Sequence, residues 1–135
     1  MKKILLFVLS FLLVGTVIAQ NNVYLIQENF NESTLPSGWT TMGNGTNNWY
    51  ISTSNISGGK PNEAHLKWTP PFNGISRLVS PAVDLTDVSS AVMTLKHYPS
   101  FFGSNQAIVG VATSSDNGTT WNSVWSEQYN ANGQF

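Results

Sequence analysis

Residues 107–126 read AIVGVATSSDNGTTWNSVWS, and this stretch decides the fold class. Its two outer parts, residues 107–113 and 120–126, are rich in β-branched and aromatic residues, which favour strands. Between them, Asn117 and Gly118 can take the positive φ angles that a tight hairpin turn requires. The stretch therefore predicts two antiparallel strands joined by a short turn.

Short strand-like segments also fill most of the remaining chain, and helical periodicity is nearly absent beyond residue 20. Segments rich in Gly, Pro, Asn and Ser separate them, and such segments are typical of turns and loops. This arrangement predicts an all-β fold, an antiparallel sandwich or barrel. The other expected strands are residues 23–30, 49–53, 63–68, 76–80 and 91–98.

The first 19 residues have the three parts of a secretory signal peptide. Lys2 and Lys3 precede an apolar run over residues 4–14, and the small residue Ala19 precedes Gln20. The apolar part is shorter than the ~20 residues that a membrane span needs. We therefore expect cleavage after residue 19, no membrane span in the remaining chain, and a secreted or cell-surface location.

Residues 20–135 are enough for one domain and not for two. Their last seven residues read as a loop that directly follows a strand, so no closing strand protects the edge of the sheet. We therefore expect this domain to be incomplete at its C-terminus and to continue into further domains of the same polypeptide.

The composition of the exported part argues against nucleic acid as a partner. Four basic side chains (Lys60, Lys67, Arg77 and Lys96) remain after the signal, against seven acidic ones, which leaves a net charge of −3. Binding to phosphates needs a clustered positive field, and these four residues are scattered. The chain has no cysteine, so core burial or bound metal must stabilise it.

Residues 114–121 fit the pattern S-x-D-x-G-x-T-W and resemble the Asp-box of sialidases and other secreted β-proteins. In such a turn, Asp116 is expected to accept hydrogen bonds from turn amides and Trp121 to fold under the loop as an anchor. A single copy of this motif indicates a structural hairpin, since kinship in fold does not carry catalysis with it.

The residues offer little support for catalysis. No thiol is present, and His65 and His97 lie in separate expected strands without the spacing of a metal-binding pair. A glycosidase needs two carboxylates across a cleft, and the spacing of the acidic residues identifies no such pair. We predict that the chain is not an enzyme.

Aromatic and amide side chains are the stronger functional signal. Sugar rings stack on aromatic faces, and amide and hydroxyl side chains bind sugar hydroxyls, so this composition favours binding of a glycan or an extracellular protein. Burial in the core is the alternative for these rings, and we expect it for Trp39, Trp49 and Trp121. The predicted ligand contacts are Trp68, Tyr98, Phe101 and Phe102, the last two in an apparent loop.

A structural calcium site is a further hypothesis. Calcium prefers several oxygen ligands from carboxylates, amides and carbonyls. Glu28, Asn62 and Glu63 lie at the edges of expected strands and loops, where such ligands could converge. We predict these three residues as the metal ligands.

The order of several motifs resembles the cleaved-adhesin, or choice-of-anchor J, domains of secreted Bacteroidetes proteins. The motifs are ENF at 28–30, LPSGW at 35–39, NWY at 48–50 and LVSPAVDL at 78–85. The resemblance spans roughly residues 27–127 and implies a jelly-roll β-sandwich related to MAM-type domains, with structural calcium. It also implies a module of a haemagglutinin-adhesin or of a secreted peptidase, often exported by type IX secretion.

These observations lead to two functional hypotheses. The first is a secreted or cell-surface adhesion module that recognises glycan or protein. The alternative is a non-catalytic accessory domain of a larger secreted peptidase or other hydrolase, which packs against the catalytic domain. The full reading frame distinguishes them, because only the second requires a hydrolase domain in the same polypeptide.

Overall fold

The computed structural model describes residues 23–101, 106–130 and 133–134, and the predicted signal peptide lies outside these ranges. Within them the chain forms strands and one short 3-10 turn, Thr46–Asn48, and no α-helix. The strands are β1 (Thr40–Gly43), β2 (Trp49–Ser52), β3 (Glu63–Leu66), β4 (Ser76–Val79), β5 (Ser100–Phe101), β6 (Ala107–Thr113), β7 (Asn122–Tyr129) and β8 (Gly133–Gln134).

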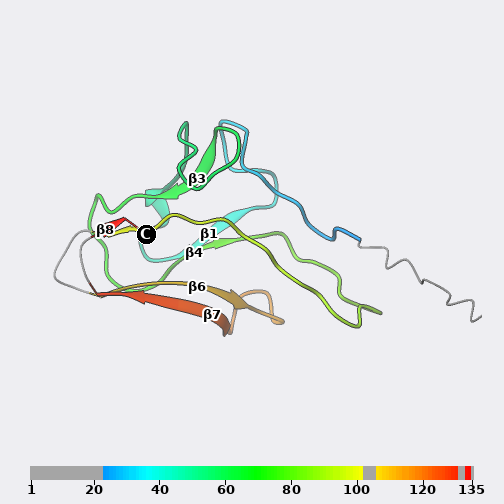
Figure 1. Ribbon diagram of the computed structural model, residues 1–135. Coiled ribbons are helices and arrows are strands. Elements are labelled where there is room, and N and C mark those ends of the chain that lie inside the picture. Colours follow the sequence, from blue (N-terminus) through cyan, green and yellow to red (C-terminus); the bar gives the residue numbers. More distant parts are fainter. Residues whose placement is uncertain (1–22, 102–105, 131–132, 135) are drawn as a thin grey trace, which may run out of the picture.

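The strands form four antiparallel ladders of two strands each: β1–β4, β2–β3, β5–β8 and β6–β7. In Figure 1 the β2–β3 and β6–β7 hairpins lie on opposite sides of the molecule, and β1 and β4 lie between them. The prediction of an all-β, antiparallel fold is therefore confirmed. The ladders are small, and their arrangement as a jelly roll stays a prediction.

The β6–β7 hairpin forms where the sequence predicts it, and its tip has the predicted bonds. The Asp116 carboxylate accepts hydrogen bonds from the main-chain N–H of Thr120 at 2.9 Å and from its hydroxyl at 2.6 Å. It also accepts one from the Ser114 hydroxyl at 2.8 Å. A carboxylate bonded three times within one turn fixes the turn, so the motif acts here as a structural element.

Two tryptophan side chains join separate ladders. The Trp121 indole donates to the Gly118 carbonyl at 2.9 Å, and the Arg77 guanidinium of β4 lies 4.9 Å from the centroid of the Trp121 ring. The Trp49 indole of β2 donates to the Ser76 hydroxyl of β4 at 2.9 Å. Both rings are half-buried. Core burial was expected for Trp39, Trp49 and Trp121, but all three rings are only half-buried. Trp121 anchors its loop as predicted, and Trp49 connects two ladders.

Three expectations about strands were wrong. Residues 91–98 and 23–30 join no ladder among the described residues, and β1 forms where the sequence predicted no strand. A strand needs a neighbour that exchanges main-chain hydrogen bonds with it. β1 has that neighbour in β4, with Thr40 opposite Val79.

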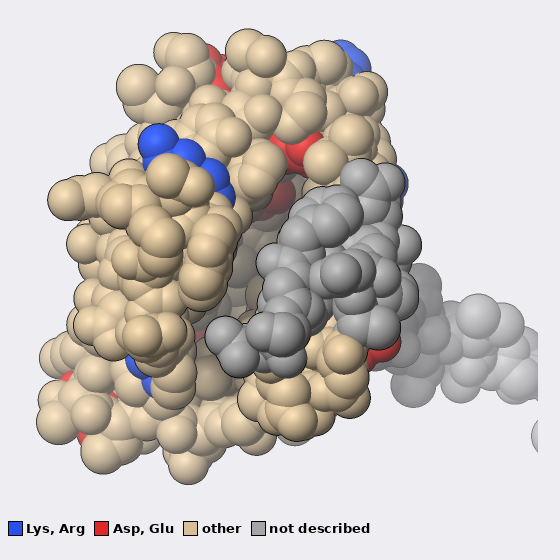
Figure 2. Space-filling view, turned by 90° about the vertical axis from the view of Figure 1, so that its left-hand side faces the viewer, with Lys and Arg blue, Asp and Glu red and all other residues tan. Residues whose placement is uncertain are grey.

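The interior is open. Within the described ranges, Tyr129 is the only buried apolar side chain, at 6% exposure. Many large apolar side chains are exposed to solvent. These include Leu25, Met93 and Val124, which line a large groove between the ladders. Figure 2 shows the hollow in one face of the molecule. No helix within the described ranges is long and apolar enough to cross a membrane.

Candidate functional site

The open end of the β2–β3 hairpin, where β2 begins and β3 ends, is organised by the buried side chain of Asn48. This residue is 1% exposed. Its side-chain amide donates to the carbonyls of Lys67 at 2.9 Å and Pro70 at 2.8 Å. Its own carbonyl accepts the N–H of Lys67 at 3.1 Å. Because buried polar groups require such partners, these bonds fix the segment that follows β3 to the turn that precedes β2.

This fixed segment presents an aromatic pair, Trp68 and Phe72. Their ring centroids lie 5.5 Å apart at an interplanar angle of 39°. The indole is 60% exposed, whereas Phe72 is half-buried and packs against Gly45, where a Cβ atom would lie 2.5 Å from the ring. Phe72 thus supports the Trp68 ring, and Trp68 exposes a large apolar surface to solvent. The predicted contact residue Trp68 is therefore accessible.

A second cluster lies at the same end of the hairpin and comes from paired strand positions. Tyr50 lies opposite His65 in the β2–β3 ladder, and their rings stack with centroids 5.0 Å apart and 20° between planes. The Tyr50 hydroxyl is 3.3 Å from His65 Nδ1, within hydrogen-bond distance. Lys67 Nζ lies 5.7 Å from the centroid of the Tyr50 ring, within the range of a cation–π contact.

We name these five residues the hairpin-end aromatic site: Tyr50, His65, Lys67, Trp68 and Phe72. Sequence reasoning assigned His65 to an ordinary strand position and did not single out Phe72. The strand register could have revealed the Tyr50–His65 pair, because two residues directly opposite each other have side chains on one face. That register depends on the hairpin as a whole and cannot be read from either strand alone.

The other predicted contact residues are not joined to this site by any contact within the described ranges. Tyr98 is half-buried and follows the extended segment 91–97. Phe102 and the side chain of Phe101 lie outside what the structure describes. Their role in binding therefore stays a prediction.

The predicted calcium ligands each hold a loop in place. The carboxylate of Glu63 accepts hydrogen bonds from the Ser54 hydroxyl and from the main-chain N–H groups of Ile56 and Ser57. Burial raises the pKa of Glu63, but these hydrogen bonds outweigh it, and the pKa lies below its ordinary value. Glu63 is therefore ionised at neutral pH and closes the loop between β2 and β3.

Asn62 and Glu28 each form hydrogen bonds with main-chain groups of residues 29–32. The Asn62 amide donates to the carbonyls of Asn31 and Glu32, both at 3.0 Å, and the Glu28 carboxylate accepts the N–H groups of Asn29 and Phe30. The structure thus brings Asn62 against the segment that follows Glu28. No group of three His, Cys, Asp or Glu side chains that could hold a metal ion occurs within the described ranges.

The three predicted calcium ligands therefore suit a bound metal ion only in part. Glu63 already uses both carboxylate oxygens on its own loop, and Asn62 directs its amide N–H groups, rather than its oxygen, at two carbonyls. A cation bound here would have to replace some of these hydrogen bonds. Calcium binding by Glu28, Asn62 and Glu63 stays a prediction.

Comparisons with protein-family models, with curated proteins and with solved structures found no match to this chain.

Proposed function

We propose that this chain is a non-catalytic recognition module of a secreted or cell-surface protein and that it binds glycan or extracellular protein through the hairpin-end aromatic site. The observation that carries the proposal is the position of Trp68. Its indole is 60% exposed, yet the segment that holds it is fixed by the buried Asn48 amide. A large ring held in place without a covering partner loses little conformational entropy on binding.

The chemistry of the site favours a ligand with both apolar and polar groups. The face of an indole ring packs well against the C–H groups of a sugar or against an apolar side chain. At the same end of the hairpin, the Tyr50 hydroxyl and the Lys67 ammonium can each donate a hydrogen bond. Such a mixture suits a carbohydrate, which presents C–H faces ringed by hydroxyl groups.

Binding to a glycan array and to a panel of matrix proteins tests this proposal. We expect a signal that Trp68→Ala abolishes and that Tyr24→Ala leaves unchanged. Tyr24 is the matched control, because it is 78% exposed and lies outside the site. If the unaltered chain binds to neither the glycan array nor the matrix proteins, the proposal is contradicted.

A second candidate function is that of an accessory domain in a larger secreted peptidase or other hydrolase. The exposed apolar side chains along the open groove favour it, since exposed apolar patches mark surfaces that pack against other domains. A hydrolase domain in the same reading frame would support it. Hydrolysis by this chain alone would contradict both candidates.

We also propose that the four ladders belong to a jelly-roll sandwich. The support is the separation of the β2–β3 and β6–β7 hairpins to opposite sides of the β1–β4 pair (Figure 1) and the resemblance in motif order. An experimental structure of the protein with its neighbouring domains tests this. Two four-stranded sheets packed face to face are expected.

A further inference from the structure

The Lys67 ammonium carries a positive charge that no carboxylate of the described residues neutralises through an ion pair. Lys67 is exposed, and its ammonium lies 5.7 Å from the centroid of the Tyr50 ring. A cation–π contact of this kind holds the ammonium beside the ring and leaves its charge unneutralised. The ammonium is therefore open to an anionic ligand.

Glu63, the acidic residue of β3, does not compensate this charge. It begins β3, whereas Lys67 directly follows the other end of that strand. Four residues of a strand span about 13 Å, which exceeds the Debye length of about 8 Å at physiological salt. The Glu63 carboxylate also accepts hydrogen bonds from Ser54, Ile56 and Ser57, in the loop between β2 and β3. Glu63 therefore serves that loop and leaves Lys67 uncompensated.

The stacked pair of Tyr50 and His65 supplies a further donor, whichever tautomer the imidazole adopts. The Tyr50 hydroxyl lies 3.3 Å from His65 Nδ1. If the hydroxyl donates to Nδ1, the imidazole proton is on Nε2, which can donate to a ligand. If Nδ1–H donates instead, the hydroxyl keeps its own proton for a ligand. In both cases a second donor accompanies the Lys67 ammonium.

We propose that the hairpin-end aromatic site binds an acidic saccharide through the carboxylate of a sugar unit. The inference rests on the proposed function and names the class of its ligand. An ionised carboxylate only accepts hydrogen bonds, so it matches a site that presents an ammonium and a second donor. Trp68 directly follows Lys67 in the chain, so an oligosaccharide of a few units can place one sugar at each.

A singly charged carboxylate suits this site better than a densely sulfated polysaccharide, because highly charged polymers need clustered basic residues. The other basic side chains lie elsewhere. Arg77 packs on the Trp121 ring, Lys60 belongs to the loop between β2 and β3, and Lys96 Nζ lies 3.7 Å from the position of a Cβ atom on Gly58 in that loop. The net charge of −3 over residues 20–135 also repels a polyanion. The expected sugar is therefore a uronic or sialic acid.

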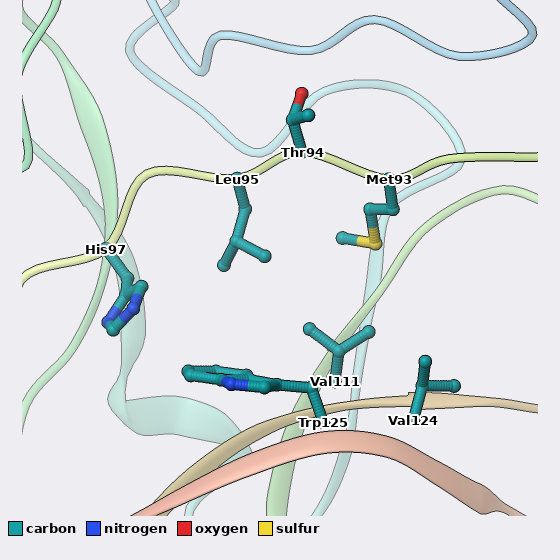
Figure 3. A pocket seen from close by; sticks show the side chains of 7 residues that line it. All are labelled: Met93, Thr94, Leu95, His97, Val111, Val124 and Trp125. Carbon is teal, nitrogen blue, oxygen red and sulfur yellow. The ribbon is translucent and has the colours of Figure 1, made fainter.

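The apolar cavity between residues 91–97 and the β6–β7 hairpin is a poorer place for this ligand. Its volume is about 470 Å³, and Figure 3 shows Met93 and Leu95 pointing toward Trp125 across it, whereas Thr94 points away. None of its lining residues is Lys or Arg. A carboxylate in this cavity would lose its hydration without a cation to replace it, which is costly.

A glycan array that pairs each acidic glycan with a neutral counterpart tests the proposal. The pairs are sialylated and desialylated oligosaccharides, and uronic acid oligosaccharides before and after reduction of their carboxyl groups. We expect the acidic member to bind about tenfold more tightly, because hydrogen bonds to charged groups are stronger than neutral ones. This preference should shrink as NaCl rises from about 0.1 M to about 1 M, since the Debye length falls from about 10 Å to about 3 Å.

Substitution of Lys67 locates the preference. Lys67→Gln keeps a donor but removes the charge, so it should bind acidic glycans about tenfold more weakly and no longer prefer them to neutral ones. Lys67→Arg should keep the preference. Lys60→Gln is the matched control, because it makes the same change of net charge at an exposed position in the loop between β2 and β3. Thermal unfolding curves that match that of the unaltered chain show that the variants fold.

The outcomes separate this inference from the proposed function. Equal binding of acidic and neutral partners, lost in Trp68→Ala, overturns the acidic ligand and leaves the glycan-binding function in place. Binding that Lys67→Gln and Lys60→Gln weaken equally, or binding of sulfated glycans alone, also overturns the inference. Binding to matrix proteins alone, lost in Lys67→Gln, assigns the site to an acidic protein instead. No binding to any glycan or matrix protein overturns both the inference and the proposed function.

Discussion

Asn48 and Lys67 are joined by a pair of hydrogen bonds that closes the open end of the β2–β3 hairpin. The Lys67 N–H donates to the Asn48 carbonyl at 3.1 Å, and the Asn48 side-chain amide donates to the Lys67 carbonyl at 2.9 Å. A third bond, from the same amide to Pro70, extends the connection to the segment that carries Trp68. The exposed ring thus depends on a buried amide for its position.

Replacement of Asn48 by alanine should therefore damage both stability and binding. Two part-buried hydrogen bonds, to the carbonyls of Lys67 and Pro70, would be lost, and each contributes about 0.5–1.5 kcal/mol net. We expect the free energy of unfolding, measured by urea denaturation, to fall by about 1–3 kcal/mol, the sum of the two contributions. Asn47→Ala is the control, because Asn47 is exposed and precedes Asn48 directly. Equal stability of the two variants would contradict the structural role of Asn48.

Trp68 and Trp121 should respond differently to the same substitution. Trp121 is half-buried, donates a hydrogen bond and packs against Arg77, so Trp121→Ala should lower the free energy of unfolding by about 2–3 kcal/mol. Trp68 is largely exposed, and Trp68→Ala should cost about 0.5 kcal/mol. Chemical denaturation of both variants measures the difference. A larger loss for Trp68 would mean that its ring serves the fold and not a ligand.

The hairpin tip should make stability depend on pH at the acidic end. Hydrogen bonds from Thr120 and Ser114 lower the pKa of Asp116 from an ordinary 3.8 to about 2. The ionised form is therefore favoured in the folded chain. The contribution of Asp116 to stability is complete above the unfolded pKa of 3.8 and is lost as the pH falls toward about 2.

Asp116→Asn removes this titration and provides the test. Thermal unfolding between pH 2 and pH 6, a range of about two units on either side of the ordinary pKa, should show a shallower acid-side decline for Asp116→Asn than for the unaltered chain. Asp87→Asn is the control, because Asp87 is also an exposed turn carboxylate. Indistinguishable slopes for the unaltered chain and Asp116→Asn would contradict the role of this carboxylate.

Calcium should raise the melting temperature if Glu28, Asn62 and Glu63 supply ligands. A ligand that binds only the folded state at about 100 times its dissociation constant adds about 2.7 kcal/mol of stability. We expect millimolar calcium to raise the melting temperature, EDTA to reverse the change, and Glu63→Gln to remove most of it. Magnesium at the same concentration controls for ionic strength. A melting curve that calcium leaves unchanged rules out this site.

Local chemistry made some parts of the molecule predictable. The β6–β7 hairpin follows from strand-forming residues on both sides of an eight-residue turn. Within that turn, Asp116 accepts a hydrogen bond from Thr120, and Trp121 donates one to Gly118.

The exposure of Trp68 was expected, but its support from Phe72 and Asn48 was not. Asn48 lies 19 residues before Lys67, whose carbonyl it bonds, and Phe72 lies close in the sequence but is held by its packing on the distant Gly45. The composition near Trp68 carries no sign of either long-range contact.

By itself, the sequence determined that this protein is built from antiparallel strands, because turn chemistry and β-forming residues act over a few neighbouring positions. Only the tertiary structure decided which extended segments became strands. Residues 91–98 have the composition of a strand and pair with no described neighbour, whereas Thr40–Gly43 was not among the expected strands and pairs with β4. The reason is physical: a residue can prefer an extended conformation alone, but a ladder needs hydrogen-bonding groups from a second segment, and folding decides where that segment lies.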